Sequence, residues 1–105
     1  MTGAMRLQHT TTSGTLTSIL LKGLLRSRSK GKLKVVWFHV PSLAPWGFLH
    51  VVRRHGGDVR RVVSVECDVP RSWLRKAPRK GLYYCVCDVP PARIRSIKTW
   101  GQISE

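Results

Sequence analysis

Apolar and polar side chains alternate along residues 5–8, Met-Arg-Leu-Gln, in the period-two pattern of a β-strand. This short strand leads directly to His9. Residues 1–4 come before the pattern, so we expect a loose N-terminus there. The first element of the fold is therefore predicted to be a strand with a histidine at its end.

The pattern changes to helical spacing directly after this histidine. Ser13 or Thr12 can cap a helix at its start, and Gly23 suits a helix end. The apolar positions of this segment recur every three or four residues, at Leu16, Ile19, Leu20 and Leu24. The sequence therefore predicts an amphipathic helix here.

The central part of the chain predicts a second strand and a second helix. Residues 35–40, Val-Val-Trp-Phe-His-Val, are β-branched and aromatic, which predicts a strand that is covered on both faces and ends before Pro41. Pro45 stands where helices begin, and Gly56 and Gly57 mark the end of the helix that follows.

The second half of the chain has the patterns of strands. Residues 59–70 alternate, which predicts a half-buried strand. Its apolar face carries Val63, Val65, Cys67 and Val69, and its polar face Ser64, Glu66 and Asp68. The basic residues 71–81 are expected to connect it to a strand over residues 82–89, and residues 90–100 add a turn and a last strand. Strand, helix, strand, helix and then strands predict an α+β domain with two helices in the N-terminal half.

Length and charge suggest what the domain binds. Residues 1–105 are expected to form a single domain with one modest core. There are 19 Lys and Arg against 5 Asp and Glu, which leaves a net charge of +14. Such a field attracts polyanions, above all nucleic acid, and the alternative is a basic surface without a specific ligand. The residues expected to contact phosphates are Lys30, Lys32, Arg60, Arg61, Arg75 and Lys76.

Apolar runs and cysteines bear on location and metal binding. No apolar run approaches the roughly 20 residues that span a bilayer, and the N-terminus lacks a signal-peptide pattern, so we expect a cytoplasmic protein without a membrane partner. Cys67, Cys85 and Cys87 are expected to be free core thiols in a reducing compartment. The alternative is a zinc site, which needs a fourth ligand and wider spacing than Cys-x-Cys, and we expect no metal.

Four stretches between residues 7 and 97 carry a family resemblance: HTTTSGTLTSILLKGL, VVWFHV, RRHG and GLYYCVCDVPPARI. In this order they resemble the catalytic lobe of the ADP-ribosyltransferase-like superfamily, and most closely its RNA 2′-phosphotransferase branch. The matching family features are a His-x-Thr strand end with its helix, a second strand, an Arg-His-Gly after the second helix, and a closing strand. The resemblance implies a small split β-sandwich whose central cleft binds NAD as a co-substrate.

The resemblance also implies roles for residues of the first two strands. His9 would hydrogen-bond a ribose hydroxyl of NAD, while backbone groups at Thr10 hold the nicotinamide amide. Thr11 and Trp37 belong to the same implied cofactor site. The alternative for His9 is a histidine whose hydrogen bonds are satisfied by local backbone.

His39 and Arg54 join His9 as implied catalytic residues. His39 lies on the same side of its strand as Trp37 and is expected to face the cleft, and the alternative is a histidine partnered on a sheet face. The guanidinium fork of Arg54 suits a phosphate. Its alternative role is a favourable interaction with the C-terminal end of a helix dipole.

The chain also departs from the family patterns. Branches that modify protein side chains carry a catalytic Glu near the last core strands, where this chain has tyrosine, and neither Glu66 nor Asp88 fits that position. The RNA 2′-phosphotransferase branch tolerates the absence because a 2′-phosphate is itself the nucleophile. That branch has an N-terminal winged-helix-like lobe with an Arg-His pair for the RNA phosphate. Here the basic loops are expected to replace it.

The sequence thus predicts an NAD-binding transferase domain that acts on a nucleic acid or its phosphate, with RNA favoured over DNA. One alternative is a catalytically inactive, basic nucleic-acid-binding module on the same fold. Another is a partner subunit or toxin-like fragment whose basic face docks an acidic protein.

Overall fold

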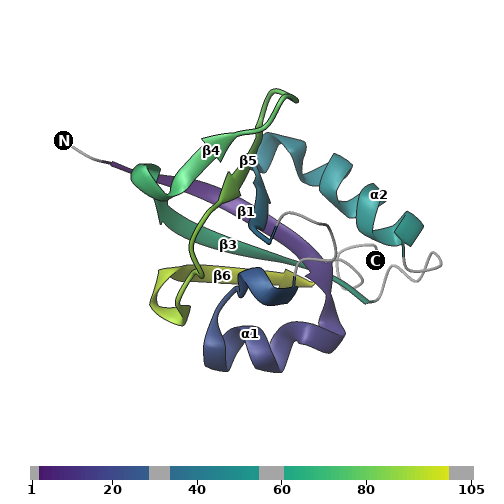
Figure 1. Cartoon of the computed structure of the whole chain (residues 1–105). Coiled ribbons are helices and arrows are strands. Elements are labelled where there is room, and N and C mark those ends of the chain that lie inside the picture. The colour runs from purple at the N-terminus through teal and green to yellow at the C-terminus, as the bar shows by residue number, and fades with distance from the viewer. Residues whose placement is uncertain (1–2, 29–33, 55–60, 100–105) are drawn as a thin grey trace.

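The computed structural model describes residues 3–28, 34–54 and 61–99, which form a mixed α+β fold. Six strands make one sheet, and two α-helices pack against it (Figure 1). The predicted α+β class is confirmed, and so is the placement of both helices in the N-terminal half. Neither described helix has the length and apolar character required to cross a membrane.

The strands and helices follow one another in the predicted order, with one additional strand. The strands are β1 (Ala4–Thr12), β2 (Val36–His39), β3 (Val62–Pro70), β4 (Leu74–Lys76), β5 (Leu82–Cys85) and β6 (Ile94–Thr99). The helices are α1 (Leu16–Lys22) and α2 (Ala44–Arg54).

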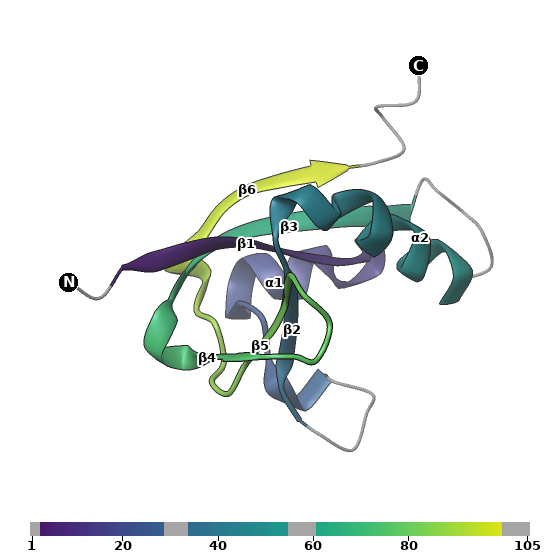
Figure 2. The ribbon, with the colours of Figure 1, turned by 90° about the horizontal axis from the view of Figure 1, so that it is seen from above.

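The sheet is antiparallel, but its two halves are joined weakly. The strand order is β4-β5-β2-β1-β3-β6. β1 pairs with β3 along its whole length, from Ala4↔Pro70 to Thr12↔Val62, whereas β1 meets β2 only at Gln8↔His39. In Figure 2, β6, β3 and β1 lie together on one side, and β2, β5 and β4 run below them. The sheet therefore nearly divides between β1 and β2.

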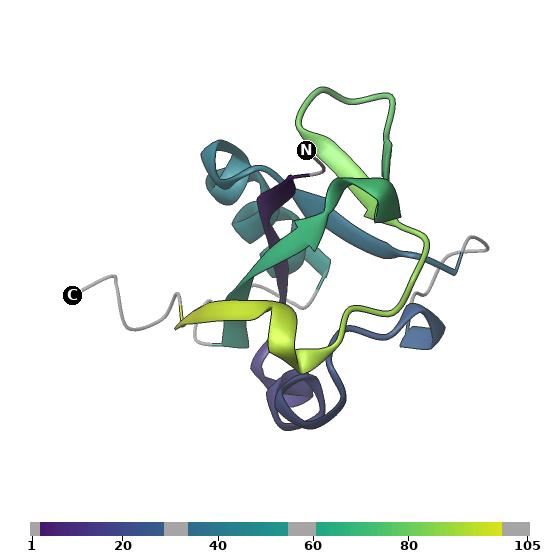
Figure 3. The same ribbon diagram turned by 90° about the vertical axis from the view of Figure 1, so that its left-hand side faces the viewer.

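The core lies between these halves and beneath the helices. Leu7, Phe38 and Val65 are buried in it. α1 contributes Ile19, and the chain beyond it is held by a β-bridge between Leu24 and Val89. α1 lies below the strands in Figure 3 and α2 lies behind them at the upper left, so the two helices cover different parts of the sheet.

The first strand and helix differ from the sequence prediction in detail. β1 begins at Ala4 and continues past His9 to Thr12, so residue 4 is not part of a loose terminus. The reason is that β3 pairs with nine consecutive residues of β1. This pairing extends β1 beyond the residues that alternate between apolar and polar. A 3-10 turn over Ser13–Thr15 precedes α1, and no side chain caps either element. Gly23 ends α1 as predicted, with a positive φ of 81°.

Two apolar side chains are more exposed than their patterns predict. Leu20 on α1 is 53% exposed, although it fits the apolar spacing of that helix. Trp37 is 43% exposed, so β2 is not covered on both of its faces. Both outcomes depend on what packs against an element, which local periodicity does not specify.

The basic connector predicted for residues 71–81 contains the strand β4. β4 has three residues, too few to show a period, and two of them are charged. Its pairing with β5 holds it in the sheet. β5 ends at Cys85, earlier than predicted, while β6 lies within its predicted range. β3 begins at Val62, later than predicted, and Ser64 on its predicted polar face is buried because α2 packs against this strand. Residues 1, 2, 56 and 57, at the predicted N-terminus and helix end, lie outside the described residues.

Candidate functional site

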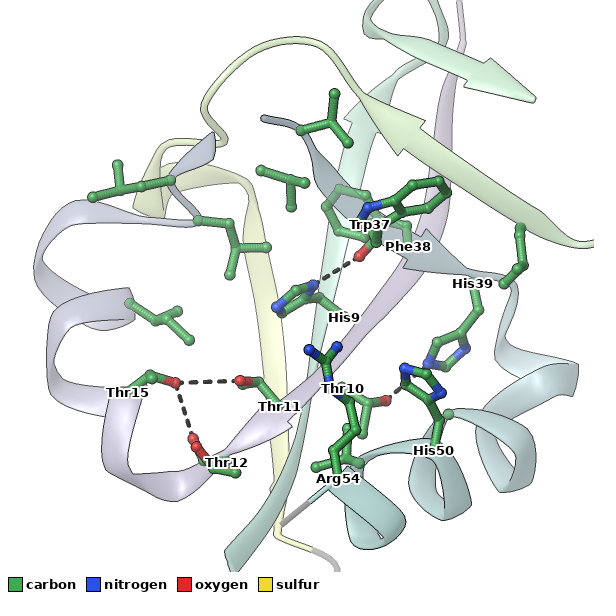
Figure 4. Close-up of a pocket in the computed structure, with 18 of the residues that line it drawn as sticks. His9, Thr10, Thr11, Thr12, Thr15, Trp37, Phe38, His39, His50 and Arg54 are labelled. Atoms are coloured by element: carbon green, nitrogen blue, oxygen red, sulfur yellow. Dashed lines mark hydrogen bonds between the residues drawn. The ribbon is translucent and has the colours of Figure 1, made fainter. Parts of the chain in front are cut away.

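A cavity of about 810 Å³ opens where the sheet nearly divides. β1 and β2 line it together with the two helices, and in Figure 4 α1 and α2 stand on either side of it. Its apolar walls include Ile19, Leu24, Val36 and Phe38. Its polar lining includes His9, Thr10, Thr11, Thr12, Thr15, His39, His50 and Arg54. This volume is in the range of cavities that hold cofactors and other small molecules.

The six residues singled out from the sequence as catalytic or cofactor-binding all line this cavity. They are His9, Thr10, Thr11, Trp37, His39 and Arg54. They come from three elements that are far apart in the sequence. The near-division of the sheet brings them together, because β1 continues from His9 to Thr12 paired with β3 while β2 turns away.

His9 has one ring nitrogen bonded and one open. Its Nδ1 lies 2.7 Å from the carbonyl oxygen of Trp37 on β2. A carbonyl only accepts, so Nδ1 carries the hydrogen and the neutral ring keeps a lone pair on Nε2. Burial lowers the pKa of His9, against an opposing effect of the Trp37 carbonyl, and nearby His39 lowers it further. Nε2 makes no hydrogen bond with the described residues, so it is available to accept one from a ligand.

His39 uses both ring nitrogens within the protein. Its Nδ1 donates to the carbonyl of Val40 at 3.0 Å, which leaves Nε2 as the acceptor for the Thr10 hydroxyl at 2.8 Å. The Thr10 hydroxyl also lies 3.2 Å from that of buried Ser64 on β3. Burial lowers the pKa of His39, which keeps the ring neutral. His39 therefore links β2 to β1 and, through Thr10, to β3, and it corresponds to the sheet-face alternative noted above.

Gly47 lets α2 approach this hydrogen-bonded group. A Cβ at position 47 would lie 2.5 Å from Nε2 of His39 and 3.0 Å from the Thr10 hydroxyl oxygen. No larger residue fits without displacing one of them. The close approach brings the cavity-lining face of α2 next to the strand ends.

Arg54 lies in the last turn of α2 and is exposed. Its guanidinium extends into the cavity on the side of His9 in Figure 4. It makes no hydrogen bond or ion pair with the described residues, so all its donors remain free for a ligand. Arg53, its neighbour in the same turn, is exposed but does not line the cavity.

Sequence reasoning missed two aromatic residues on α2. Trp46 and His50 line the cavity, and their rings stack at 5.3 Å with an interplanar angle of 14°. The guanidinium of Arg79 lies 5.3 Å from the Trp46 ring centre, a cation–π distance. The signal was present in the sequence, because Trp46, His50 and Arg54 are spaced four residues apart on one helical face.

The cavity is lined by basic and neutral groups. No described residue of its lining is acidic. Glu66 and Asp68 lie 3.4 and 3.5 Å from Nε of Arg6, and Asp88 lies 3.3 Å from Nε of Arg26. The three described carboxylates are therefore engaged elsewhere, and the lining suits an anionic ligand.

The prediction of buried core thiols is confirmed for two of the three cysteines and not for Cys87, which follows the end of β5. Cys67 and Cys85 are buried, Cys87 is partly exposed, and all three are free thiols. Burial, helped by Asp68 and Glu66, raises the pKa of Cys67 to about 12, so this thiol stays protonated at neutral pH. Among the described residues no cluster of three or more His, Cys, Asp or Glu side chains is arranged to hold a metal ion.

The basic residues predicted to contact nucleic acid are dispersed. Arg75 and Lys76 lie on the edge strand β4, whereas Arg61 directly precedes β3, with β5, β2 and β1 between them in the sheet. All three are exposed. Lys30, Lys32 and Arg60 lie outside the described residues.

Comparison with known proteins does not assign the chain to a family. No family model matches it, and no curated protein is significantly similar to it.

Proposed function

We propose that this chain is an NAD-binding transferase domain of the ADP-ribosyltransferase-like type, closest to RNA 2′-phosphotransferases, that acts on a nucleic acid or its phosphate. The observation that carries the proposal is one cavity of about 810 Å³ that brings together Nε2 of His9 and the guanidinium of Arg54, neither of which has a hydrogen-bond partner among the described residues. The cavity lining has no acidic side chain among the described residues, which suits the diphosphate of an anionic dinucleotide.

The fold supports the same proposal. The resemblance implies a split β-sandwich with a central cleft, and this sheet has a single pairing between β1 and β2 at Gln8↔His39. The cavity opens at this point. The His-Thr-Thr segment lines it at the end of the first strand, as the resemblance implies for the nicotinamide side of the cleft.

The lining residues suit the chemistry of an ADP-ribosyl transfer. NAD would supply the ADP-ribosyl group, whose bond to nicotinamide breaks with the electron pair leaving on nicotinamide while an acceptor oxygen bonds to the same ribose carbon. His9 would orient a ribose hydroxyl through Nε2, and Arg54 would bind a phosphate. The apolar walls would exclude water from the reacting carbon.

The absence of a carboxylate from the described lining limits the acceptor. A hydroxyl acceptor needs a base to remove its proton, whereas a phosphate oxygen is already anionic at neutral pH. This favours a terminal or 2′-phosphate of RNA. The same observation also fits the second candidate function, a catalytically inactive nucleic-acid-binding module on this fold, and NAD binding separates the two.

Replacing His9 with alanine is expected to weaken NAD binding several-fold. The substitution removes the only open ring acceptor of His9, and one oriented hydrogen bond is worth on the order of 1 kcal/mol. Calorimetric titration of both proteins with NAD measures the effect, and their melting temperatures report on folding. The Trp37 carbonyl also loses its donor, so a small fall in melting temperature is expected. Equal NAD affinity in the two folded proteins would remove His9 from the site, and a wild type without NAD affinity would favour the inactive module.

Replacing Arg54 with alanine is expected to lower NAD affinity tenfold or more, because hydrogen bonds to charged groups are worth roughly 1.5–3 kcal/mol. Arg53→Ala is the matched control. It removes the same charge from the same helical turn, and thus the same interaction with the helix dipole, but from a residue outside the cavity. Equal losses in the two variants would show a general charge effect and would contradict a specific phosphate contact by Arg54.

A further inference from the structure

Three side chains form a row across the outer face of the sheet half made by β2, β5 and β4. Trp37 pairs with Tyr84, and Tyr84 pairs with Arg75. Directly paired residues of antiparallel strands project on the same face of a sheet. The next row, on the opposite face, is buried and consists of Val36, Cys85 and Leu74. The Trp37–Tyr84–Arg75 row therefore projects away from the core.

The row presents planar groups to solvent. The rings of Trp37 and Tyr84 are 5.4 Å apart and tilted by 55°. Trp37 is 43% exposed, Tyr84 is partly exposed and Arg75 is exposed. Nη1 of Arg75 donates to the carbonyls of Leu74 and Ser72 at 2.9 and 3.2 Å, which holds the guanidinium in place. Its Nε and Nη2 donors have no partner within residues 3–28, 34–54 and 61–99, so they can bind a ligand.

An aromatic pair that ends in an arginine has the chemistry of a single-stranded nucleic-acid platform. Unpaired bases stack on aromatic rings, and arginine binds the phosphates between them. The bases of a duplex are stacked on each other and cannot use such a row. The net charge of +14 complements a polyanion, whereas an apolar protein surface would leave Arg75 without a partner.

The row is continuous with the cavity. Trp37 belongs to both, since it lines the cavity as well as starting the row. A single-stranded nucleic acid bound along Arg75, Tyr84 and Trp37 would therefore reach the cavity at Trp37. The carbonyl of this residue accepts the hydrogen bond from His9.

We infer that the Trp37–Tyr84–Arg75 row binds single-stranded RNA by base stacking and leads it to the cavity. Two parts of this inference rest on the proposed function: that the bound nucleic acid is RNA, and that it is led to the cavity. Tyr84 and Arg75 do not line the cavity, so their variants test the row while every cavity-lining side chain is kept.

Replacing Tyr84 with leucine is expected to weaken binding of single-stranded RNA about tenfold, because base stacking on an aromatic ring contributes roughly 1–3 kcal/mol. Tyr84→Phe keeps the ring and should bind like the wild type. Fluorescence anisotropy with a labelled oligouridylate measures both, with a duplex RNA of matched length as the competing substrate. The wild type should prefer the single strand, and melting temperatures establish that each variant is folded.

Arg75→Ala provides a second variant in case Tyr84→Leu does not fold. It should weaken RNA binding more than Lys22→Ala, which removes the same charge from exposed α1, away from the row. The inference is overturned if Tyr84→Leu binds as tightly as Tyr84→Phe, if Arg75→Ala and Lys22→Ala are equivalent, or if duplex binds as well as single strand. NAD titration of Tyr84→Leu should match the wild type. A wild type without NAD affinity would refute the proposed transferase and leave the stacking row supported.

Discussion

Raising the salt concentration from roughly 50 to 200 mM is expected to weaken RNA binding by about 50-fold. A protein that neutralises phosphates releases the counterions condensed on them. For a single strand the logarithm of the affinity then falls with the logarithm of salt at a slope of about 0.7 per phosphate contact, and about four contacts produce this loss. The chain has 19 Lys and Arg against 5 Asp and Glu to supply such contacts.

The slope is measured by repeating the anisotropy titration over a series of salt concentrations. Arg75→Ala should lower it by about 0.7, the share of one phosphate contact. Lys22→Ala serves as the control, because its position on α1 lies outside the stacking row. An affinity that stays constant across the series would contradict electrostatic binding of RNA by this chain.

The Gly47→Ala variant is expected to be less stable than the wild type by about 1–2 kcal/mol, because overpacking a filled site costs about 1–3 kcal/mol before any gain in helix propensity. The added methyl group would lie 2.5 Å from Nε2 of His39. That ring is buried and hydrogen-bonded at both nitrogens, so it has little freedom to move. Alanine favours a helix over glycine by up to about 1 kcal/mol, which offsets only part of the cost.

Thermal unfolding monitored by circular dichroism measures this effect, since each kcal/mol lowers the Tm of a domain of this size by roughly 4–8 °C. Gly14→Ala is the matched control, because nothing lies within 4 Å of a Cβ at that position. NAD affinity should fall with Gly47→Ala, since α2 and Arg54 move away from His9. A Gly47→Ala protein as stable as the Gly14→Ala protein would mean that α2 does not pack this closely on the strands.

Local patterns in the sequence were sufficient to predict α1, α2, β3 and β6. α1 and β3 have a clear period, whereas proline and glycine marked α2 and turn signals marked β6. β4 was not predictable in this way, because three residues carry no period and only pairing with β5 makes them a strand. The extent of β1 beyond His9 likewise came from its pairing with β3.

The candidate site was likewise predictable from the sequence only in part. The family motifs marked His9, Thr10, His39 and Arg54, and the structure brings these four to one cavity. Helical spacing alone would have placed Trp46 and His50 on the face of Arg54, but whether that face meets a cavity depends on what α2 packs against.

Residue identity and local spacing thus determined most of the elements, the basic character of the chain and the residues able to bind an anion. Only the tertiary structure decided that His39 is engaged by Thr10 while Nε2 of His9 remains open. It also decided that Trp37, Tyr84 and Arg75 form one row. The physical reason is that strand register and helix packing join residues far apart in the chain, whereas periodicity reports only which side of its own element a residue faces.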